Sequence, residues 1–174
     1  MPMEVRVVAY DPDWPQMFRN ESRQIAAVLG PDLIEIHHIG STAITGIYAK
    51  PIIDMLGEAR HLAAVDRHAA EMTDLGYEAL GEFGIPGRRY FRKETPEGRR
   101  THHLHVFSAG CDQVRRHLGF RDFMNRHPEW AQRYSALKRK LAAAHPDDIE
   151  AYMDGKDPFI GEIDRLVARR QSGD

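Results

Sequence analysis

The chain has 174 residues, of which 42% are hydrophobic, and its 24 basic and 26 acidic side chains give a formal net charge of -2. This length is far above the roughly 40 residues below which a chain rarely folds unaided, so we expect a single domain over residues 1–174. Because charges of both signs are interspersed, no global field draws the protein to nucleic acid or to an anionic membrane. The composition excludes general nucleic-acid binding and predicts that any anionic partner is met locally.

Cysteine content and hydropathy indicate the compartment. Cys111 is the single cysteine of the chain and cannot form an internal disulfide, which suits a reducing environment. The first 14 residues have no basic region followed by an apolar core, and no apolar run approaches the roughly 18 residues needed to span a bilayer. We therefore expect a cytoplasmic protein without a membrane partner. The sequence predicts no particular oligomeric state.

The N-terminal part of the chain alternates between strand and helix patterns. Residues 3–14 begin as an alternating strand and break in a Pro-rich loop, and residues 14–30 carry apolar side chains at helical spacing before a Gly-Pro stop. Residues 33–41 are typical of a strand, whose alternation places His37 on one face and His38 on the other.

The next segments continue this alternation. Residues 41–49 predict a short helix or helical turn capped by Ser41 or Thr42, and residues 50–56 a second apolar strand. Residues 60–76 predict one amphipathic helix that ends at a glycine.

The remainder of the chain separates into a strand region and a helical region. Residues 77–110 predict strands joined by Gly/Pro turns, with "TPEG" turning a hairpin. From Asp112 onward the pattern is helical, with interruptions expected at "HPEW", "HPDD" and "GKDP". We expect an α+β protein with a small mixed sheet in residues 1–110 and a helical part in residues 111–174.

Several separated motifs, in the same order, resemble the GrpB family, also described as UPF0157. The likeness runs from about Val5 to the C-terminal helix and is carried by "HIGSTAITGIYAKPIIDM", "GIPGRRYFRK", "HHLHVF", "FRDFMNRHPEWAQRYSALKRKLA" and "YMDGKDPFI". The resemblance implies the nucleotidyltransferase fold, a small mixed sheet flanked by helices. Members also resemble a domain fused to dephospho-CoA kinase in some bacteria. The resemblance therefore says more about fold than about function.

The resemblance also implies how a phosphorylated substrate is held. In nucleotidyltransferases a Gly-Ser turn at a helix start binds phosphates through backbone N–H groups and the hydroxyl, which Gly40 and Ser41 match, with Thr42 next to them. Lys50, at the entrance of the following strand, is a further candidate for phosphate binding. Asp54 matches the first metal-binding carboxylate of that strand.

A second carboxylate, expected two residues after Asp54, is replaced by Leu56. Two-metal chemistry uses two or three carboxylates, so this departure leaves the metal site short of ligands. We take Ser41, Lys50 and Asp54 as the candidate catalytic residues.

Imidazoles can complete the metal site. Alternation in "THHLHVF" sends His103 and His105 to one face, where the superfamily commonly carries its last acidic ligand. Oxygen ligands suit Mg²⁺, whereas nitrogen ligands together with Asp54 favour Zn²⁺, Mn²⁺ or Fe²⁺ over Mg²⁺. The plain alternative is a hydrogen-bonded or solvated histidine pair on a half-exposed strand.

A basic stretch offers further anion-binding groups. "GIPGRRYFRK" contains three arginines whose planar guanidinium groups suit bidentate phosphate contacts. They are Arg88, Arg89 and Arg92. Strand alternation allows Arg88, Tyr90 and Arg92 to share a face. The alternative is a charged hairpin that protects a sheet edge from aggregation.

Two tyrosine–lysine pairs in the helical part have a spacing of four residues. Tyr134 with Lys138, and Tyr152 with Lys156, therefore lie on the same helix faces. In the functional interpretation the lysines bind distal phosphates and a tyrosine stacks on a base or sugar. In the structural interpretation the tyrosines are core or boundary residues and the lysines are their solvated neighbours.

Three functions are consistent with these residues. The first is a nucleotidyltransferase that binds a nucleoside triphosphate and a divalent metal and transfers a nucleotidyl group to an acceptor that the sequence does not identify. The second is a degenerate module that binds a nucleotide or coenzyme without turnover, as Leu56 suggests. The third is a His/Asp metal-dependent phosphohydrolase. A kinase or serine hydrolase is disfavoured because no Walker loop or nucleophile elbow is present.

Overall fold

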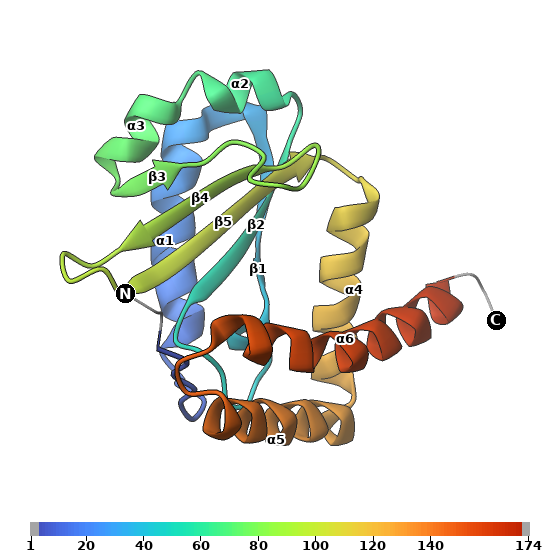
Figure 1. Cartoon of the computed structure of the whole chain (residues 1–174). Coiled ribbons are helices and arrows are strands. Elements are labelled where there is room, and N and C mark those ends of the chain that lie inside the picture. The colour runs from blue at the N-terminus through green and yellow to red at the C-terminus, as the bar shows by residue number, and fades with distance from the viewer. Residues whose placement is uncertain (1–3, 172–174) are drawn as a thin grey trace.

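A computed structural model describes residues 4–171 as a mixed sheet covered by helices on both faces (Figure 1). The strands are β1 (Leu33–Ile39), β2 (Ile53–Ala59), β3 (Tyr77–Ala79), β4 (Arg89–Glu94) and β5 (Arg100–Ser108). The α-helices are α1 (Trp14–Leu29), α2 (Leu62–Asp66), α3 (Ala69–Asp74), α4 (Asp112–Arg126), α5 (Pro128–Ala144) and α6 (Ile149–Gln171), and the 3-10 turns are η1 (Gly30–Asp32) and η2 (Ser41–Ala43). The expected α+β class with a helical C-terminal part is confirmed.

The five strands lie in the order β1-β2-β5-β4-β3. β2 and β5 pair in parallel, whereas the β1–β2, β4–β5 and β3–β4 pairs are antiparallel. The β2–β5 pairing places Asp54 directly beside His103. The expected hairpin turn is present, since the Gly98 N–H donates to the Thr95 carbonyl at 2.9 Å. The sheet is therefore centred on the two strands that carry the predicted metal ligands.

Alternation along β2 divides the protein into two layers. Its residues Ile53 and Met55 face α1 and join the main apolar core with Ile25, Leu29 and Leu104. The opposite face carries Asp54, Leu56 and Glu58, and its buried Leu56 packs with Ile39, Phe107 and Val114 of α4. One face of β2 is therefore entirely apolar and covered by α1. The other face has an apolar centre at Leu56 and a charged residue at each end, Asp54 and Glu58.

The helical part packs on the chain that follows β1. Ile44 and Ile47 are fully buried among Phe123, Tyr134 and Ile163, from α4, α5 and α6. Figure 1 shows α5 and α6 below one end of the sheet and α4 along its side. This packing brings the C-terminal helices over the ends of β1 and β2. Within residues 4–171, no helix combines the length and apolar character needed to cross a membrane.

The strand expected at the start of residues 3–14, before the Pro-rich loop, is wrong. Met3 lies outside the described residues, and the following segment forms only an isolated bridge between Val8 and Ala49. The Val5 N–H donates instead to the carbonyl of Pro146 at 2.9 Å, which ties this segment to the loop before α6. This segment therefore packs between the N-terminal and C-terminal parts of the chain and does not pair as a strand of the sheet.

The single helix expected over residues 60–76 is also wrong, because α2 and α3 are separate. The break lies at Arg67 and His68, where His68 leaves helical geometry with φ -98° and ψ 12°. The His68 Nδ1 atom then lies 3.1 Å from the Glu71 carboxylate in the first turn of α3. A local side-chain contact of this kind competes with the continuous helical ladder.

The interruption expected at "GKDP" is absent, since α6 continues through Pro158. An interior proline removes one backbone hydrogen bond and costs about 3 kcal/mol. Phe159 stacks on Tyr134 with a centroid separation of 5.3 Å, and Ile163 is fully buried. Burial of these side chains offsets the proline cost. The expected breaks at "HPEW" and "HPDD" are confirmed, because α5 begins at Pro128 and ends at Ala144.

Candidate functional site

A cavity of about 340 Å³ lies between the sheet and the helices α4, α5 and α6. Sequence segments far apart meet in it, including the η2 turn, the start of β2, strand β5 and the first half of α6. Besides Gly40, its polar lining residues are Ser41, Thr42, Lys50, Asp54, His103, His105, Arg116, His117, Tyr134, Tyr152 and Lys156. The Gly-Ser turn, the aspartate and both candidate histidines therefore share one cavity.

Gly40 brings the turn into contact with Asp54. Its φ of +71° is in the left-handed region, and a Cβ atom at this position would lie 2.9 Å from the Asp54 Oδ2 atom. Both the backbone conformation and the close approach require glycine. The turn is thereby held against the carboxylate, and the Ser41 hydroxyl hydrogen bonds with buried Tyr134.

The Thr42 side chain holds the turn in place through two hydrogen bonds inside the protein. Its hydroxyl donates to the Ile52 carbonyl at 3.1 Å and therefore accepts from the Nε2–H of His38, at 2.9 Å. Burial lowers the pKa of His38 to about 4, which keeps the imidazole neutral in this arrangement. Thr42 was expected to bind phosphate, but its hydroxyl is used inside the protein. Only its backbone remains for a ligand.

Asp54 and two basic side chains form a chain of contacts at the cavity wall. The Asp54 Oδ1 atom lies 3.0 Å from His105 Nε2, and the Arg88 Nη1 atom lies 3.3 Å from His105 Nδ1. Burial raises the pKa of Asp54, but the charge and hydrogen bond of His105 outweigh it, so the pKa falls to about 2. Asp54 is thus an ionised carboxylate at neutral pH.

His103 presents an unpaired nitrogen beside this carboxylate. Its Nε2 atom is buried and has no hydrogen-bond partner among the described residues. Burial lowers the pKa of His103 to about 4, so its neutral ring can accept a hydrogen bond or bind a metal. The chemistry of Asp54 with a neutral imidazole fits a divalent metal such as Mn²⁺ or Zn²⁺, with Mg²⁺ less suited to nitrogen.

The three predicted metal ligands nevertheless do not form a complete coordination site. Across residues 4–171, Asp54, His103 and His105 do not bring one ligand atom each within 4.8 Å of one another. Leu56, in place of a second carboxylate, is fully buried and cannot contribute. A metal at Asp54 would therefore need oxygen atoms from a bound ligand to complete its coordination.

Lys50, from the segment before β2, and Lys156, Tyr134 and Tyr152, from the helical part, complete the cavity that contains Asp54. The Lys50 and Lys156 Nζ atoms lie 5.5 Å and 4.8 Å from the centre of the Tyr152 ring. Burial lowers the pKa of Lys156 to about 8 and also lowers that of Lys50. The charge of Lys50 also disfavours that of Lys156, and an anion near both would remove that penalty.

Lys138 lies behind these two lysines. It is 1% exposed, its Nζ atom has no hydrogen-bond partner among the described residues, and it lies 4.8 Å from the Tyr134 ring centre. Burial, and then the charges of Lys156 and Lys50, lower the pKa of Lys138 to about 6. The expected same-face placement of both tyrosine–lysine pairs is present, and the lysines are buried instead of solvated.

The arginines of β4 and the preceding loop are placed differently from one another. Arg88 is buried and reaches His105 without lining the cavity. Arg89 is on the opposite face and forms an ion pair with Asp66 at 2.7 Å. Arg92 forms an ion pair with Glu78 at 2.9 Å. Both outer arginines thus already have carboxylate partners. β4 lies between β5 and β3, so the alternative of a charged edge strand does not describe them.

Arg116 and His117 of α4 line the cavity and were not among the residues expected at the site. The His117 ring stacks near His105 with centroids 6.2 Å apart, and burial lowers the pKa of His117 to about 4. No motif marks either residue. Only the packing of α4 against the sheet face that carries Asp54 reveals them.

The fold and this site together define a mixed α+β protein with a basic cavity at the end of its sheet. The family model for the GrpB protein matches residues 4–165. The UPF0157 protein YqkA of Bacillus subtilis is 44% identical over 170 residues, which cover 98% of this chain and 49% of that protein. The Glutamate-rich protein GrpB of Alkalihalophilus pseudofirmus is 35% identical over 163 residues, covering 92% of this chain and 94% of that protein.

A solved structure agrees with these relatives. The crystal structure of conserved protein GrpB from Enterococcus faecalis superposes with a TM-score of 0.90 at 39% identity, covering 95% of this chain and 99% of that chain. The chain therefore belongs to the GrpB family, also described as UPF0157. It spans about half the length of YqkA and nearly the full length of the GrpB relatives.

Proposed function

We propose that this chain is a nucleotidyltransferase-fold protein that binds a nucleoside triphosphate with a divalent metal in the cavity, and transfers a nucleotidyl group to an acceptor. One observation carries the proposal: Lys50 and Lys156 line the cavity that also contains Asp54 and the Gly40–Ser41 turn, and the buried amine of Lys138 lies close enough for their charges to lower its pKa. An anionic ligand with several phosphate groups matches this charge distribution.

The charge balance of the lining supports an anionic ligand. The cavity is lined by the cationic residues Lys50, Arg116 and Lys156 and by the single carboxylate of Asp54. Lys138 adds a buried amine without a hydrogen-bond partner among the described residues. A buried polar group without a partner costs free energy, so a ligand oxygen near these amines would stabilise the bound state.

The residues have distinct roles in the proposed complex. Lys50 and Lys156 bind phosphate oxygens, and the Ser41 hydroxyl and the backbone of the Gly40 turn contact the phosphate nearest to Asp54. Asp54, with His103 beside it, holds the metal. When bound, the metal would neutralise the negative charge that develops on the transferred phosphoryl group. His105 positions the Asp54 carboxylate through its Nε2 atom, and Arg88 positions His105 through its Nδ1 atom.

A second candidate function is binding of a nucleotide or coenzyme without turnover. The observation that favours it is the buried apolar side chain of Leu56 at the position of a second carboxylate. Both candidates require the same cavity and the same anion. They differ in whether the metal-bound phosphate reacts.

Calorimetric titration with ATP, with and without Mn²⁺ or Mg²⁺, tests the binding shared by both candidates. We expect saturable binding that strengthens with metal, and we expect Asp54→Asn to remove the metal dependence while the lysines retain residual affinity. Absence of ATP binding under all these conditions contradicts both candidates. Release of pyrophosphate from ATP in the presence of Mn²⁺ and a mixture of cell metabolites would then separate transfer from simple binding.

A further inference from the structure

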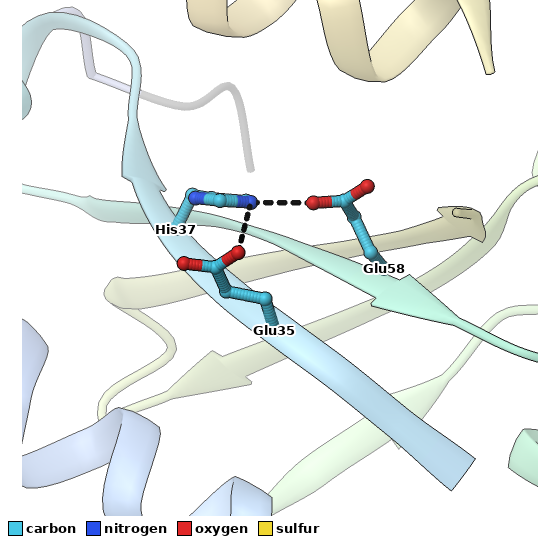
Figure 2. Close-up of side chains that lie close together, drawn as sticks. All are labelled: Glu35, His37 and Glu58. Atoms are coloured by element: carbon cyan, nitrogen blue, oxygen red, sulfur yellow. Dashed lines mark hydrogen bonds and ion pairs between the residues drawn. The ribbon is translucent and has the colours of Figure 1, made fainter. Parts of the chain in front are cut away.

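A second polar cluster lies on the same face of the sheet, at the opposite end of the β1–β2 pair. It consists of Glu35 and His37 of β1 and Glu58 of β2, shown in Figure 2, where all three side chains point to one side of the strands. Among residues 4–171 it is the one group of three potential ligands whose ligand atoms lie within 4.8 Å of one another. The proposed nucleotide cavity includes none of these residues.

Backbone geometry places the two carboxylates directly opposite each other. Glu35 and Glu58 are cross-strand partners because the register shifts between Leu33 and Glu35. β-bulges of this kind redirect side chains, and like charges directly opposite on antiparallel strands are destabilising. Within the described part of the chain, neither carboxylate has a lysine or arginine partner, and His37 is the shared neighbour of both. The two carboxylates therefore face each other with one imidazole as their common neighbour.

One imidazole nitrogen faces both carboxylates. The His37 Nε2 atom lies 2.7 Å from a Glu58 oxygen and 3.8 Å from a Glu35 oxygen. A single N–H proton satisfies the nearer oxygen and leaves the farther one beyond hydrogen-bonding distance. Ligand atoms around a tetrahedral Zn²⁺ with bonds of about 2.1 Å are separated by about 3.4 Å. The two observed distances bracket this separation, so small side-chain rotations accommodate a metal in place of the proton.

The site is held firmly on one side and open on the other. Glu58 is 15% exposed and its second oxygen accepts the Gly110 N–H at 3.0 Å, while His37 is 13% exposed. Glu35 is 63% exposed, which leaves room for water ligands. Two fixed ligands supported by a backbone hydrogen bond, and a third that closes from solvent, are typical of an exchangeable metal site.

We propose that Glu35, His37 and Glu58 form a site for a divalent transition metal, of the Zn²⁺ class, that links the edge strand β1 to β2. One nitrogen and two carboxylate ligands suit Zn²⁺ or Mn²⁺ and are less suited to Mg²⁺ or Ca²⁺. Binding of the metal at His37 Nε2 displaces the proton from that nitrogen, and the ring remains a neutral imidazole that carries its proton on Nδ1. The metal neutralises both facing carboxylates and thereby stabilises the edge of the sheet.

Zn²⁺ titration of Asp54→Asn tests this site alone, because that variant lacks the carboxylate proposed to hold metal in the cavity. We expect one Zn²⁺ to bind and to raise the melting temperature. We expect Glu35→Gln in the same background to weaken Zn²⁺ binding at least tenfold. Glu35 is exposed, so this substitution preserves the fold, and Glu97→Gln, at an exposed glutamate in the β4–β5 turn, is the matched control.

Co²⁺ provides a second readout of the ligands. In the Asp54→Asn protein, Co²⁺ should give visible absorption bands that are lost on replacement of His37 by Ala. Equal Zn²⁺ affinity in Asp54→Asn with and without Glu35→Gln contradicts the proposal, as does absence of Zn²⁺ binding to Asp54→Asn. In either case the cluster is a hydrogen-bonded group only. Neither result affects ATP binding at the cavity.

Discussion

At one end of the β1–β2 pair, Asp54 is the single carboxylate among the lysine, arginine and histidine side chains that line the cavity. Near it, the buried nitrogen atoms Lys138 Nζ and His103 Nε2 have no hydrogen-bond partner among the described residues. At the other end, two carboxylates share one imidazole, and no lysine or arginine of the described residues pairs with them. The first region has an excess of positive groups and suits an anion. The second has an excess of negative groups and suits a cation.

An apolar cluster separates the two regions. Leu56 lies between Asp54 and Glu58 on this face of β2. It packs with Ile39, which pairs with Asp54, and with Phe107, which pairs with Glu58, and all three are nearly or fully buried. Leu56, which removes a carboxylate from the nucleotide cavity, is thus part of the core that keeps the two regions apart. The comparison implies that substitutions in one region leave ligand binding in the other unchanged.

The largest expected effect is on ligand affinity at the cavity. Lys156→Met removes an ammonium group while it preserves most of the apolar stem that contacts Tyr152. A charge-assisted hydrogen bond contributes about 1.5–3 kcal/mol, so ATP affinity should fall by roughly 10- to 100-fold. Isothermal calorimetry measures this change. Lys140→Met, at an exposed lysine of α5, is the matched control and should bind ATP like the wild type.

That substitution also tests the separation of the two regions. Zn²⁺ affinity in the Asp54→Asn background should be unaffected by Lys156→Met. A parallel loss of ATP and Zn²⁺ binding would show that the two regions are coupled or that the fold is disturbed.

Gly40→Ala should destabilise the protein through contact with Asp54. Gly40 and Gly46 both have positive φ, at 71° and 83°, but only at Gly40 would a Cβ atom meet a neighbour, Asp54 at 2.9 Å. Conformational strain of about 1–3 kcal/mol is common to both positions. Gly40→Ala should therefore melt below Gly46→Ala, by roughly 4 °C for an added ~1 kcal/mol or more. Equal melting temperatures would mean that Asp54 moves away freely.

Lys138→Met should stabilise the protein without a ligand. The pKa of Lys138 is lowered to about 6, whereas in the unfolded chain it is near its usual value of about 10.4. Between these pH values the unfolded chain binds one more proton, so wild-type stability rises with pH. The gain from Lys138→Met should be greatest below pH 6 and shrink as the pH approaches 10.

Thermal melting at a series of pH values measures this effect. A gain of roughly 4 °C at pH 6 is expected for a chain of this size if the change in stability is ~1 kcal/mol or slightly more. The same variant should bind ATP more weakly, because the unpaired amine is lost. A gain in stability that does not depend on pH would attribute the effect to packing alone.

The smallest expected effect is that of Tyr134→Phe. It removes the hydrogen bond between Tyr134 and Ser41 but preserves the stacking of the ring on Phe159. A hydrogen bond of this kind contributes about 0.5–1.5 kcal/mol. We expect a decrease of roughly 2 °C in melting temperature. A melting temperature equal to that of the wild type would show that Ser41 does not depend on this contact.

Much of the fold follows from local sequence patterns, but three local expectations failed. Alternation in β1, the short apolar run in β2 and the helical spacing of α1 predicted these elements because their apolar residues face one core. The N-terminal strand, the undivided helix over residues 60–76 and the break at Pro158 failed. In each case a long-range contact or a local side-chain hydrogen bond decided the backbone.

The candidate site was predictable only in part. Strand alternation and the family motifs brought Gly40, Asp54 and His105 together, because all three depend on β1, β2 and β5 pairing. The cavity residues Arg116 and His117 depend on how α4 packs, which has no local signal. The alternation in residues 33–41 that separated His37 from His38 gave no information on the partner strand that brings Glu58 to His37.

The central claim is that the cavity binds an anion with several phosphate groups, held by lysines opposite Asp54. A crystal structure of the protein with a non-hydrolysable ATP analogue and Mn²⁺ tests it most directly. We predict phosphate oxygens at the Gly40–Ser41 turn and at Lys50 and Lys156, with the anomalous signal of Mn²⁺ beside Asp54. A nucleotide bound elsewhere on the surface, with solvent alone in the cavity, would contradict the claim.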